Sequence, residues 1–330
     1  SGTLGEPMAW LDTPGDWQWM LENWNVVLKN AGVRKGAKCF FAFSFGPFLG
    51  FWTAYEAAMQ RGCLCIPGGG QSSEQRLKII LEQEVEYLFC TPTYALHLLE
   101  VANEAGIDLS GNQLRSIIVA GETGGSEKGM REKISKQWNG VQIYDHYGMT
   151  EVGPVAYEIP GQSGGLRIIQ ESYFAEVVDP QSEQSIPSGE LGELVLTTLG
   201  RVGCPVLRYR SGDLVKVEEG VDEKGIPTFD LIGGILGRAD DMVVVRGVNL
   251  YPASVDAVIR KFDEVQEYRV YKERVGSMLE LTIEVEASLE VAILIEVALK
   301  ESFSLRIPVE SVDRGTFPRF EMKAKRWEDK

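Results

Sequence analysis

Apolar residues follow two different spacings over the first half of the chain. Between Trp17 and Leu28 they recur every three or four positions and Gly32 follows as a stop, which predicts an amphipathic helix. Short apolar runs then alternate with helical patterns as far as residue 148. We expect helices over 48–60, 74–83, 94–105 and 126–138, and strands over 39–43, 63–67, 85–90, 114–121 and 141–148. Such alternation predicts an α/β fold with a mostly parallel sheet covered on both faces.

The pattern changes to strands and turns after about Ser163. YFAEVVDP (173–180), LGELVLTTL (191–199) and VLRYRSGD (206–213) predict an antiparallel or barrel-like β subdomain. After Asp240 the chain has helical patterns at 253–262 and 291–303 and strand patterns near 265–271, 278–286 and 307–313. We therefore predict a large N-terminal domain, 1–239, and a small mobile α+β C-terminal domain, 240–330, with the boundary in 233–241.

Composition and charge narrow the class of protein. The 330 residues are 44% hydrophobic and carry a formal charge of −15, which argues against a nucleic acid polymer as partner. The cysteines form no CxxC pair, so we expect reduced thiols and a cytoplasmic location. The uncharged stretch 39–55 is broken by Gly46-Pro47 and is shorter than a membrane span requires. No signal peptide is visible, although a chain that starts with Ser1 can have lost an upstream stretch.

The first residues, SGTLGEP, have the composition of a phosphate-binding loop. Ser1 and Thr3 offer hydroxyls, and the glycines allow several backbone N–H groups to turn toward one anion. An ordinary surface loop has the same composition, so both interpretations stay open. Glu6 stands where such loops usually carry a lysine.

A second candidate site is YDHYGMTEVGP, residues 144–154, which follows a predicted strand. Tyr147 offers a flat face for a base, Thr150 a hydroxyl, and Glu151 an oxygen ligand suited to Mg²⁺ beside a phosphate. Ligands bind at strand ends of this kind in open α/β sheets. A polar loop with a core tyrosine is the alternative.

A third candidate site lies in RYRSGD, residues 208–213. Strand alternation predicts Arg208 and Arg210 on one face, Tyr209 on the other, and Asp213 at the following turn. A carboxylate there can accept hydrogen bonds from both hydroxyls of a ribose. A surface β-turn would also explain the Gly-Asp pair.

Taken in order, these segments resemble a known family. SGTxG, AGE (120–122), YDHYGMTE (144–151), RYRSGD (208–213), GRADDMVVVRGVN (237–249) and the terminal PRFEMKAKR (318–326) are similar to the adenylate-forming superfamily of acyl- and aryl-CoA synthetases. The segments GELVLTTLGRVGCPVLRYRSGD and DDMVVVRGVNLYP are most similar to the phenylacetate-coenzyme A ligase family. The resemblance covers essentially the whole chain.

The resemblance implies a two-step reaction with ATP, Mg²⁺ and coenzyme A. A carboxylate would attack the α-phosphorus of ATP to give acyl-AMP and pyrophosphate, and the thiol of coenzyme A would then displace AMP. Thr150 would contact the α-phosphate, and Glu151 would hold Mg²⁺. The other implied nucleotide-binding residues are Ser1, Thr3 and Gly5 at the β- and γ-phosphates, Gly121, Glu122, Asp145 and Tyr147 around the adenine, Asp213 at the ribose, Arg238 at the ribose or phosphate side, and Gly148.

The C-terminal residues would serve catalysis and the second substrate. The resemblance makes Lys323 the catalytic lysine of the first step, together with Thr150, and Asp240 the hinge between two domain orientations. Arg246 and Gly247 would bind coenzyme A in the second step. Without the upstream motifs, Lys323 would be a solvated lysine of a basic tail.

The acid substrate is expected to be a small aromatic or arylacetic carboxylic acid. Phe43 and Phe48 fall where the resembling family has aromatic pocket residues, and His146 is a further pocket candidate. Core packing is the alternative for both phenylalanines. A homodimer is also left open.

Three departures from the family pattern keep other functions open. Family members have a stretch before the phosphate loop, Met322 replaces a typical glycine, and Glu6 replaces the loop lysine. One alternative is an adenylation protein that loads the pantetheine of a carrier protein. The other is a nucleotide-binding protein that has lost catalysis.

Overall fold

The structure is a computed structural model that describes residues 8–46, 48–122, 124–275, 278–319 and 325–330. The chain divides into two compact units, Ser1–Ile235 and Leu236–Lys330. This division falls inside the predicted boundary stretch, 233–241. The boundary at 239/240 and the mobility of the second unit stay predictions.

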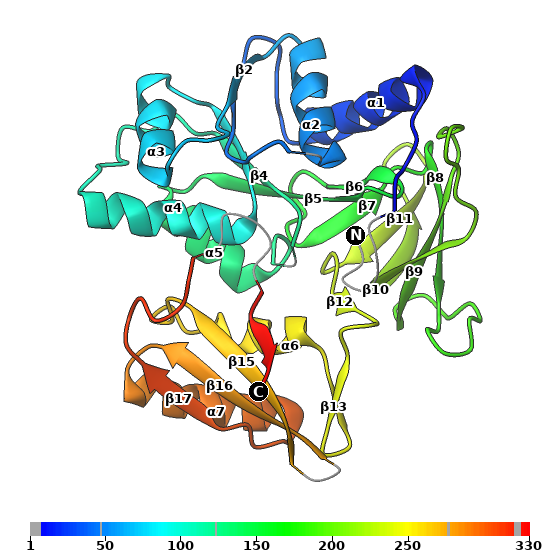
Figure 1. Cartoon of the computed structure of the whole chain (residues 1–330). Helices are drawn as coiled ribbons and strands as arrows, with labels where there is room; N and C mark the ends of the chain where they lie inside the picture. Colours follow the sequence, from blue (N-terminus) through cyan, green and yellow to red (C-terminus); the bar gives the residue numbers. More distant parts are fainter. Residues whose placement is uncertain (1–7, 47, 123, 276–277, 320–324) are drawn as a thin grey trace. The chain divides into compact units, whose positions relative to one another are not determined.

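The first unit begins with the predicted helix–strand alternation (Figure 1). Its parallel strands lie in the order β2-β1-β3-β4-β5, which confirms the expected parallel sheet. The strands are β1 (Lys38–Phe41), β2 (Leu64–Pro67), β3 (Tyr87–Cys90), β4 (Ser116–Val119) and β5 (Gln142–Met149). The helices are α1 (Pro14–Asn30), α2 (Leu49–Gln60), α3 (Ser73–Glu82), α4 (Pro92–Ala105) and α5 (Lys128–Gln137).

Local sequence signals explain where these helices start and stop. Thr13 and Asp16 form a capping box at the start of α1, and Ser72 and Gln75 form another at α3. The Thr91 side chain caps α4, and Gly106 ends that helix in the left-handed conformation. Each cap satisfies backbone N–H or C=O groups at a helix end that have no partner within the helix.

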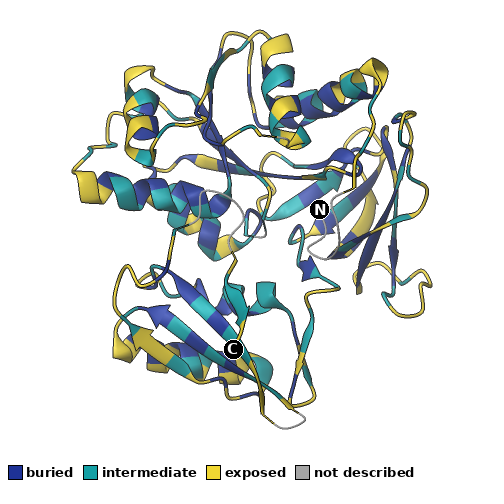
Figure 2. Ribbon diagram, in the orientation of Figure 1, coloured by how far each residue is buried: buried dark blue, intermediate teal, exposed yellow. Residues whose placement is uncertain are grey.

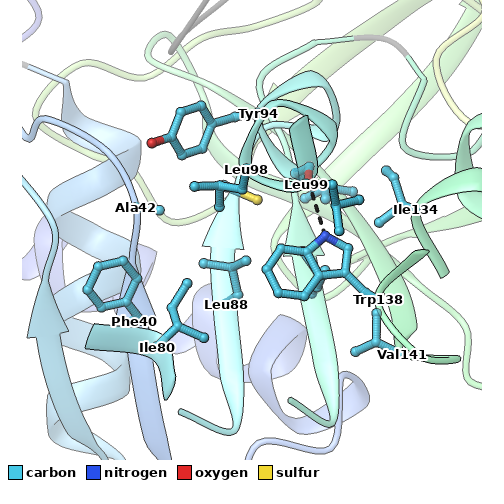
Figure 3. Close-up of a cluster of buried hydrophobic side chains, with 14 of the residues drawn as sticks. Phe40, Ala42, Ile80, Leu88, Tyr94, Leu98, Leu99, Ile134, Trp138 and Val141 are labelled. Atoms are coloured by element: carbon cyan, nitrogen blue, oxygen red, sulfur yellow. Dashed lines mark hydrogen bonds between the residues drawn. The ribbon is translucent and has the colours of Figure 1, made fainter. Parts of the chain in front are cut away.

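Helices cover both faces of the parallel strands. Phe40 of β1 packs with α3, α4 and α5, whereas Phe41 packs on the opposite face with α1 and α2. The first of these cores is shown in Figure 3, where the buried Trp138 donates a hydrogen bond from Nε1 to the Ala95 carbonyl at 3.1 Å. Burying a side chain of this size stabilises the fold by roughly 2–3 kcal/mol. Figure 2 shows the central strands mostly buried and the outer helix faces exposed.

The antiparallel strands continue the same sheet. β5 pairs with β6, and the order then runs β6-β7-β11-β10-β9-β8. Among the described strands no pairing joins β8 back to β6, so this part is an antiparallel extension and not a closed barrel. The bounds are β6 (Gly153–Glu158), β7 (Gly165–Ile168), β8 (Tyr173–Val178), β9 (Leu191–Thr198), β10 (Tyr209–Val221) and β11 (Pro227–Ile232).

One prediction about local structure is wrong. Asp213 lies inside β10, where the pairing with β9 shifts between Arg210 and Leu214, and not at a turn. In addition, Arg208 has a φ of +49°, which interrupts the strand alternation that was expected for its neighbours. The bulge arises because Ser211 and Gly212 bond to β9: the Ser211 hydroxyl donates to the Leu194 carbonyl at 2.7 Å and the Gly212 amide to Glu193 at 3.1 Å.

The second unit is the predicted small α+β module. Its main sheet has the order β17-β16-β15-β18, and a separate hairpin joins β13 to β14. One apolar core binds the sheet, the hairpin and both helices together. The bounds are β12 (Gly237–Arg238), β13 (Val243–Val245), β14 (Val248–Leu250), α6 (Pro252–Ile259), β15 (Tyr268–Val275), β16 (Met278–Glu286), α7 (Leu289–Phe303), β17 (Val309–Val312) and β18 (Trp327–Asp329).

Two bulk properties of the structure bear on the sequence predictions. In the described part of the chain, no helix has both the length and the apolarity needed to cross a bilayer. The cysteines of the structure are all free thiols, Cys39 and Cys90 buried and Cys63, Cys65 and Cys204 half-buried.

Candidate active site

The candidate nucleotide site lies at the carboxyl edge of the parallel strands. Val119, the last residue of β4, pairs with Asp145 of β5, so the loop that carries Gly121 and Glu122 leaves the sheet beside Asp145. Ligands bind at this edge in open α/β sheets. Two motifs that are separated in sequence are therefore neighbours here.

Tyr147 and Asp213 are in direct contact. The Tyr147 hydroxyl donates a hydrogen bond to Oδ2 of Asp213 at 2.6 Å, and both residues are buried. The Asp213 backbone N–H in turn donates to the Ser211 hydroxyl at 3.0 Å. Residues from β5 and β10 thus form one hydrogen-bonded unit, which joins the predicted adenine residue to the predicted ribose residue.

Asp145, two positions before Tyr147 in β5, occupies a tight, buried position. Its Oδ2 accepts the Ser126 hydroxyl at 2.5 Å, and its Oδ1 accepts the His146 backbone N–H at 2.9 Å. A Cβ on Gly125 would lie 2.3 Å from Oδ1, so only glycine fits there. Burial raises the pKa of Asp145 to about 7, and the nearby charge of Glu158 adds to the shift.

A buried ion pair that the sequence motifs did not include supports Asp145. Both Arg131 terminal nitrogens donate to Glu158 at 2.7 Å, and Glu158 Oε2 also accepts the Asp145 backbone N–H at 2.8 Å. The Arg131 side chain also donates to the carbonyls of Gly125 and Ile143. No local pattern points to this pair, because its partners lie on α5 and β6 and meet only in the fold.

Glu122 is fixed by the first turn of α4. Its Oε1 accepts the backbone N–H of Thr93 at 2.8 Å and the Thr93 hydroxyl at 2.6 Å. A carboxylate at a helix N-terminus is stabilised by the helix dipole. Gly121 before it has a φ of +93°, a conformation that favours glycine.

The turn after β5 contains Gly148, Thr150 and Glu151. A Cβ on Gly148 would lie 2.7 Å from the Gly153 carbonyl, so close approach of β6 requires this glycine whatever its role toward a ligand. Thr150 is exposed, and its carbonyl accepts a hydrogen bond from Arg201 at 2.8 Å. Glu151 is 5% exposed.

The chemistry of this turn fits a magnesium ion. Within the described residues, no group of three or more His, Cys, Asp or Glu side chains could hold a metal alone. Mg²⁺ is commonly bound by one or two carboxylates together with waters and substrate phosphates, so a single hard-oxygen ligand such as Glu151 suffices.

The candidate residues of the second unit are held in ion pairs. Arg238 donates to both oxygens of Asp240, at 2.8 and 3.0 Å, so the predicted ribose or phosphate residue and the predicted hinge contact each other. Arg246 and Gly247 form the two-residue turn of the β13–β14 hairpin, with φ of +50° and +82°. Arg246 is bound to both carboxylate oxygens of Glu280 on β16.

The three predicted pocket residues lie in different surroundings. Phe43 is buried and stacks on Phe51 with ring centroids 4.0 Å apart, and Phe48, which is half exposed, meets the same ring at 5.5 Å. Phe51 thus joins the two predicted aromatic residues. His146 packs against Trp24 at 4.2 Å and bonds through Nδ1 to the Ala156 carbonyl, and burial lowers its pKa to about 4.

Several predicted residues lie outside the described part of the chain. These are Ser1, Thr3, Gly5 and Glu6 of the opening loop, and Met322 and Lys323. Their roles stay predictions.

Comparison with protein-family models supports the resemblance read from the motifs. A model described as "AMP-binding enzyme" matches residues 1–200, and one described as "AMP-binding enzyme C-terminal domain" matches residues 247–330.

Comparison with individual proteins agrees. The chain is 32% identical to phenylacetate-coenzyme A ligase of Pseudomonas putida over 88% of this chain and 65% of that protein. It is also 32% identical to the Escherichia coli (strain K12) phenylacetate-coenzyme A ligase, over 98% of this chain and 76% of that protein. The chain therefore spans about two thirds of the length of the first of these relatives.

Solved structures have the same fold. A 2-hydroxyisobutyryl-CoA ligase in the postadenylation state, in complex with R3-HIB-AMP, is 27% identical with a TM-score of 0.89, over 96% of this chain and 70% of that one. An anthranilate CoA ligase in complex with anthranoyl-AMP, at 21% identity, has a TM-score of 0.69 over 97% of this chain and 63% of that one. The chain belongs to the AMP-binding enzyme family, the adenylate-forming superfamily.

Proposed function

We propose that this chain is an ATP-dependent acyl- or aryl-CoA ligase. Family membership supports the reaction class, and the observation that carries the proposal for this chain is the Tyr147–Asp213 contact. It brings together two motifs that are 66 positions apart, and both have the polar groups that a nucleoside needs.

The first half-reaction is adenylation. The substrate carboxylate attacks the α-phosphorus of ATP, an acyl-phosphate bond forms, and pyrophosphate leaves. Asp213 accepts the ribose hydroxyls, Tyr147 borders the adenine, and Thr150 contacts the α-phosphate. Glu151 would hold Mg²⁺, which would supply positive charge to the phosphates when bound.

The second half-reaction is thioester formation. The sulfur of coenzyme A attacks the acyl carbon, the thiol proton is lost, and AMP leaves with the bridging oxygen. Arg246 and Gly247 serve the coenzyme in this step. Because Arg246 is bound to Glu280 on an exposed surface, the coenzyme phosphate must compete with that carboxylate.

The acid substrate that we propose is a small aromatic or arylacetic acid. Phe43, Phe48 and Phe51 form a joined aromatic cluster just beyond β1, at the same edge of the sheet as the nucleotide residues. The phenylacetate-coenzyme A ligases to which the chain is similar support this class. Pyrophosphate exchange over a panel of aromatic and aliphatic acids tests it, and exchange only with aliphatic acids would contradict it.

Lys323 provides the test of the adenylation mechanism. We expect Lys323→Ala to slow acyl-AMP formation by roughly a hundredfold or more, because a donor aimed at developing charge is lost. The reaction of supplied acyl-AMP with coenzyme A should be largely unchanged. Lys325→Ala, which removes an exposed lysine two positions away, is the matched control and should affect neither step. Equal loss in both steps would remove Lys323 from the mechanism.

Asp240 provides the test of the domain rotation. Asp240→Pro fixes φ at the proposed hinge and should leave adenylation intact while thioester formation fails. Asp240→Ala also removes the ion pair with Arg238 but leaves the backbone free, so it should retain both steps. Normal rates for both steps in Asp240→Pro would show that the pivot lies elsewhere.

A further inference from the structure

Three of the five cysteines of the chain lie together at the first two strands. In the parallel pairing of β1 with β2, Cys39 stands opposite Cys65. Cys63 directly precedes β2, and because side chains alternate along a strand it shares a face with Cys65. That face packs on α1 and α2, and all three cysteines belong to the apolar cluster there. Cys39 therefore has two cysteine neighbours on the adjacent segment.

The end of α2 fixes the position of Cys63. Gly62 has a φ of +82°, and the Cys63 backbone N–H donates to the Ala58 carbonyl at 3.0 Å, which is the bonding pattern of a helix that ends at a left-handed glycine. The next residue, Leu64, donates to the Ala37 carbonyl at 2.9 Å and starts the pairing with β1. The Cys63 thiol is thereby placed where the helix end meets the sheet.

The thiols of Cys39 and Cys63 are in contact but differ in exposure. Cys39 is 0% exposed, and its thiol donates a hydrogen bond to the Cys63 sulfur. Cys63 is half-buried, and its own Sγ donates to the Arg34 carbonyl at 3.5 Å at the protein surface. The Cys65 Sγ instead contacts the carbonyls of Tyr55 and Cys63, at 3.9 and 3.8 Å. A small reagent can thus reach Cys63, and the sulfur next to it is that of Cys39.

The same contacts make Cys63 the most acidic thiol of the three. The hydrogen bond from Cys39 lowers the pKa of Cys63, and the charge of Arg61 acts in the same direction, against burial and the carboxylate of Glu86. That hydrogen bond and burial raise the pKa of Cys39, and burial raises the pKa of Cys65 to about 12. Because the thiolate is the reactive form of cysteine, Cys63 is the expected point of attack on an oxidant.

We propose that Cys63 and Cys39 are a peroxide-reactive pair that closes to a reversible disulfide. The Cys63 thiolate attacks a hydroperoxide: an S–O bond forms, the O–O bond breaks, and the departing oxygen takes up the proton that Cys63 had lost. The Cys39 sulfur then attacks the Cys63 sulfur, an S–S bond forms, and the S–O oxygen leaves as water with the Cys39 proton. The two thiols together lose two electrons to the peroxide, and a dithiol reductant reverses the change. The proposal does not depend on the proposed ligase function.

The main test maps the oxidation products of the whole chain. Reduced protein, freed of reductant, is treated with hydrogen peroxide, alkylated, digested and analysed by mass spectrometry. The Cys39–Cys63 disulfide should be the main product, and dithiothreitol should restore both thiols. Cys204, a half-buried thiol outside the cluster, is the internal reference, and Cys63 should be oxidised at least about tenfold faster. Equal oxidation of Cys63 and Cys204, a main product that contains Cys65, or the lack of a Cys39–Cys63 disulfide would overturn the proposal.

Three variants test the order of the two steps. In Cys39→Ala the sulfenic acid of Cys63 has no partner, so dimedone, which traps sulfenic acids, should label Cys63. Cys63→Ser should form no disulfide and leave Cys39 reduced. Cys65→Ser is the matched control, because it removes the residue opposite Cys39 and should still form the wild-type disulfide.

The opposite results would contradict this order. An unlabelled Cys63 in Cys39→Ala, a dimedone label on Cys39 in Cys63→Ser, or loss of the disulfide in Cys65→Ser would each overturn the proposal. If Cys39→Ala does not fold, as judged by circular dichroism, dimedone is added during oxidation of the wild-type chain. A label on Cys63 then supports the proposal, and a label on Cys39 or no label on Cys63 overturns it.

Discussion

The two units hold their candidate site residues in different ways. In the first unit Asp145, Tyr147 and Asp213 are buried, and each is bonded to a partner from another part of the chain. In the second unit Arg238, Asp240 and Arg246 are bonded to carboxylate or guanidinium partners on or near the surface. Exposed ion pairs contribute little to stability, whereas removing one partner of a buried polar pair is costly.

The candidate residues of the first unit are therefore held in fixed positions, whereas those of the second unit can change partners. The buried groups of the first unit are already oriented by their protein partners, which would lower the entropy cost of binding a nucleotide at the proposed site. The ion pairs of the second unit can open at little cost, so a phosphate or a new backbone conformation can replace them. The proposed mechanism, with two successive domain orientations, would need both kinds of contact.

Among the variants that test this contrast between the two units, the largest effect is expected from Asp213→Ala. The variant removes the proposed ribose acceptor and leaves the buried Tyr147 hydroxyl without its 2.6 Å partner. The apparent KM for Mg·ATP in pyrophosphate exchange should rise by more than about tenfold. Tyr147→Phe removes the same hydrogen bond but keeps the carboxylate, and it should have a clearly smaller effect. Equal effects would show that the hydrogen bond, and not the carboxylate, matters to the nucleotide.

Gly125→Ala tests whether the first unit is as rigid as its contacts indicate. The new Cβ would lie 2.3 Å from Asp145 Oδ1 and must displace that side chain. We expect a loss of about 1–3 kcal/mol in the free energy of unfolding, measured by urea denaturation. Gly111→Ala is the control, because a Cβ there meets nothing within 4 Å. An unchanged stability in Gly125→Ala would mean that the site is adaptable.

Asp145 should make stability depend on pH. The pKa of Asp145 is about 7 in the folded chain, above the ordinary value of 3.8. Between pH 3.8 and about pH 7, the folded chain therefore keeps a proton on Asp145 that the unfolded chain has lost. The stabilisation is fully present below about pH 4 and is lost as pH rises to about 7, at up to roughly 1.4 kcal/mol per pH unit. Between about pH 5 and about pH 8, the free energy of unfolding measured by urea denaturation should therefore fall less in Asp145→Asn than in the wild type. Identical decreases would show that Asp145 is ionised throughout.

The smallest effect is expected in the second unit, from Glu280→Gln. This variant weakens the hold on Arg246, so the apparent KM for coenzyme A should fall by about threefold if Arg246 meets a coenzyme phosphate. Arg246→Ala should raise that KM by a similar factor. Neither variant should alter pyrophosphate exchange. A large loss of stability in Glu280→Gln would mean that this pair is a structural support like those of the first unit.

The sequence by itself determined the order of the elements. The apolar spacing of α1 and the short apolar runs of β3 and β4 are local signals, and the structure confirms the elements that they predict. Local spacing also placed Tyr147, Thr150 and Asp213 as candidates, because each belongs to a short motif of unusual composition.

Only the tertiary structure decided which residues are partners. Arg131–Glu158, Arg201–Asp12 and Tyr147–Asp213 join positions 27, 189 and 66 residues apart. It also placed Asp213 in a bulge of β10 and not at a turn, since that bulge depends on bonds to β9. The physical reason is that capping and periodicity act within a few residues, whereas the partner of a buried charge depends on which strands and helices are packed against each other.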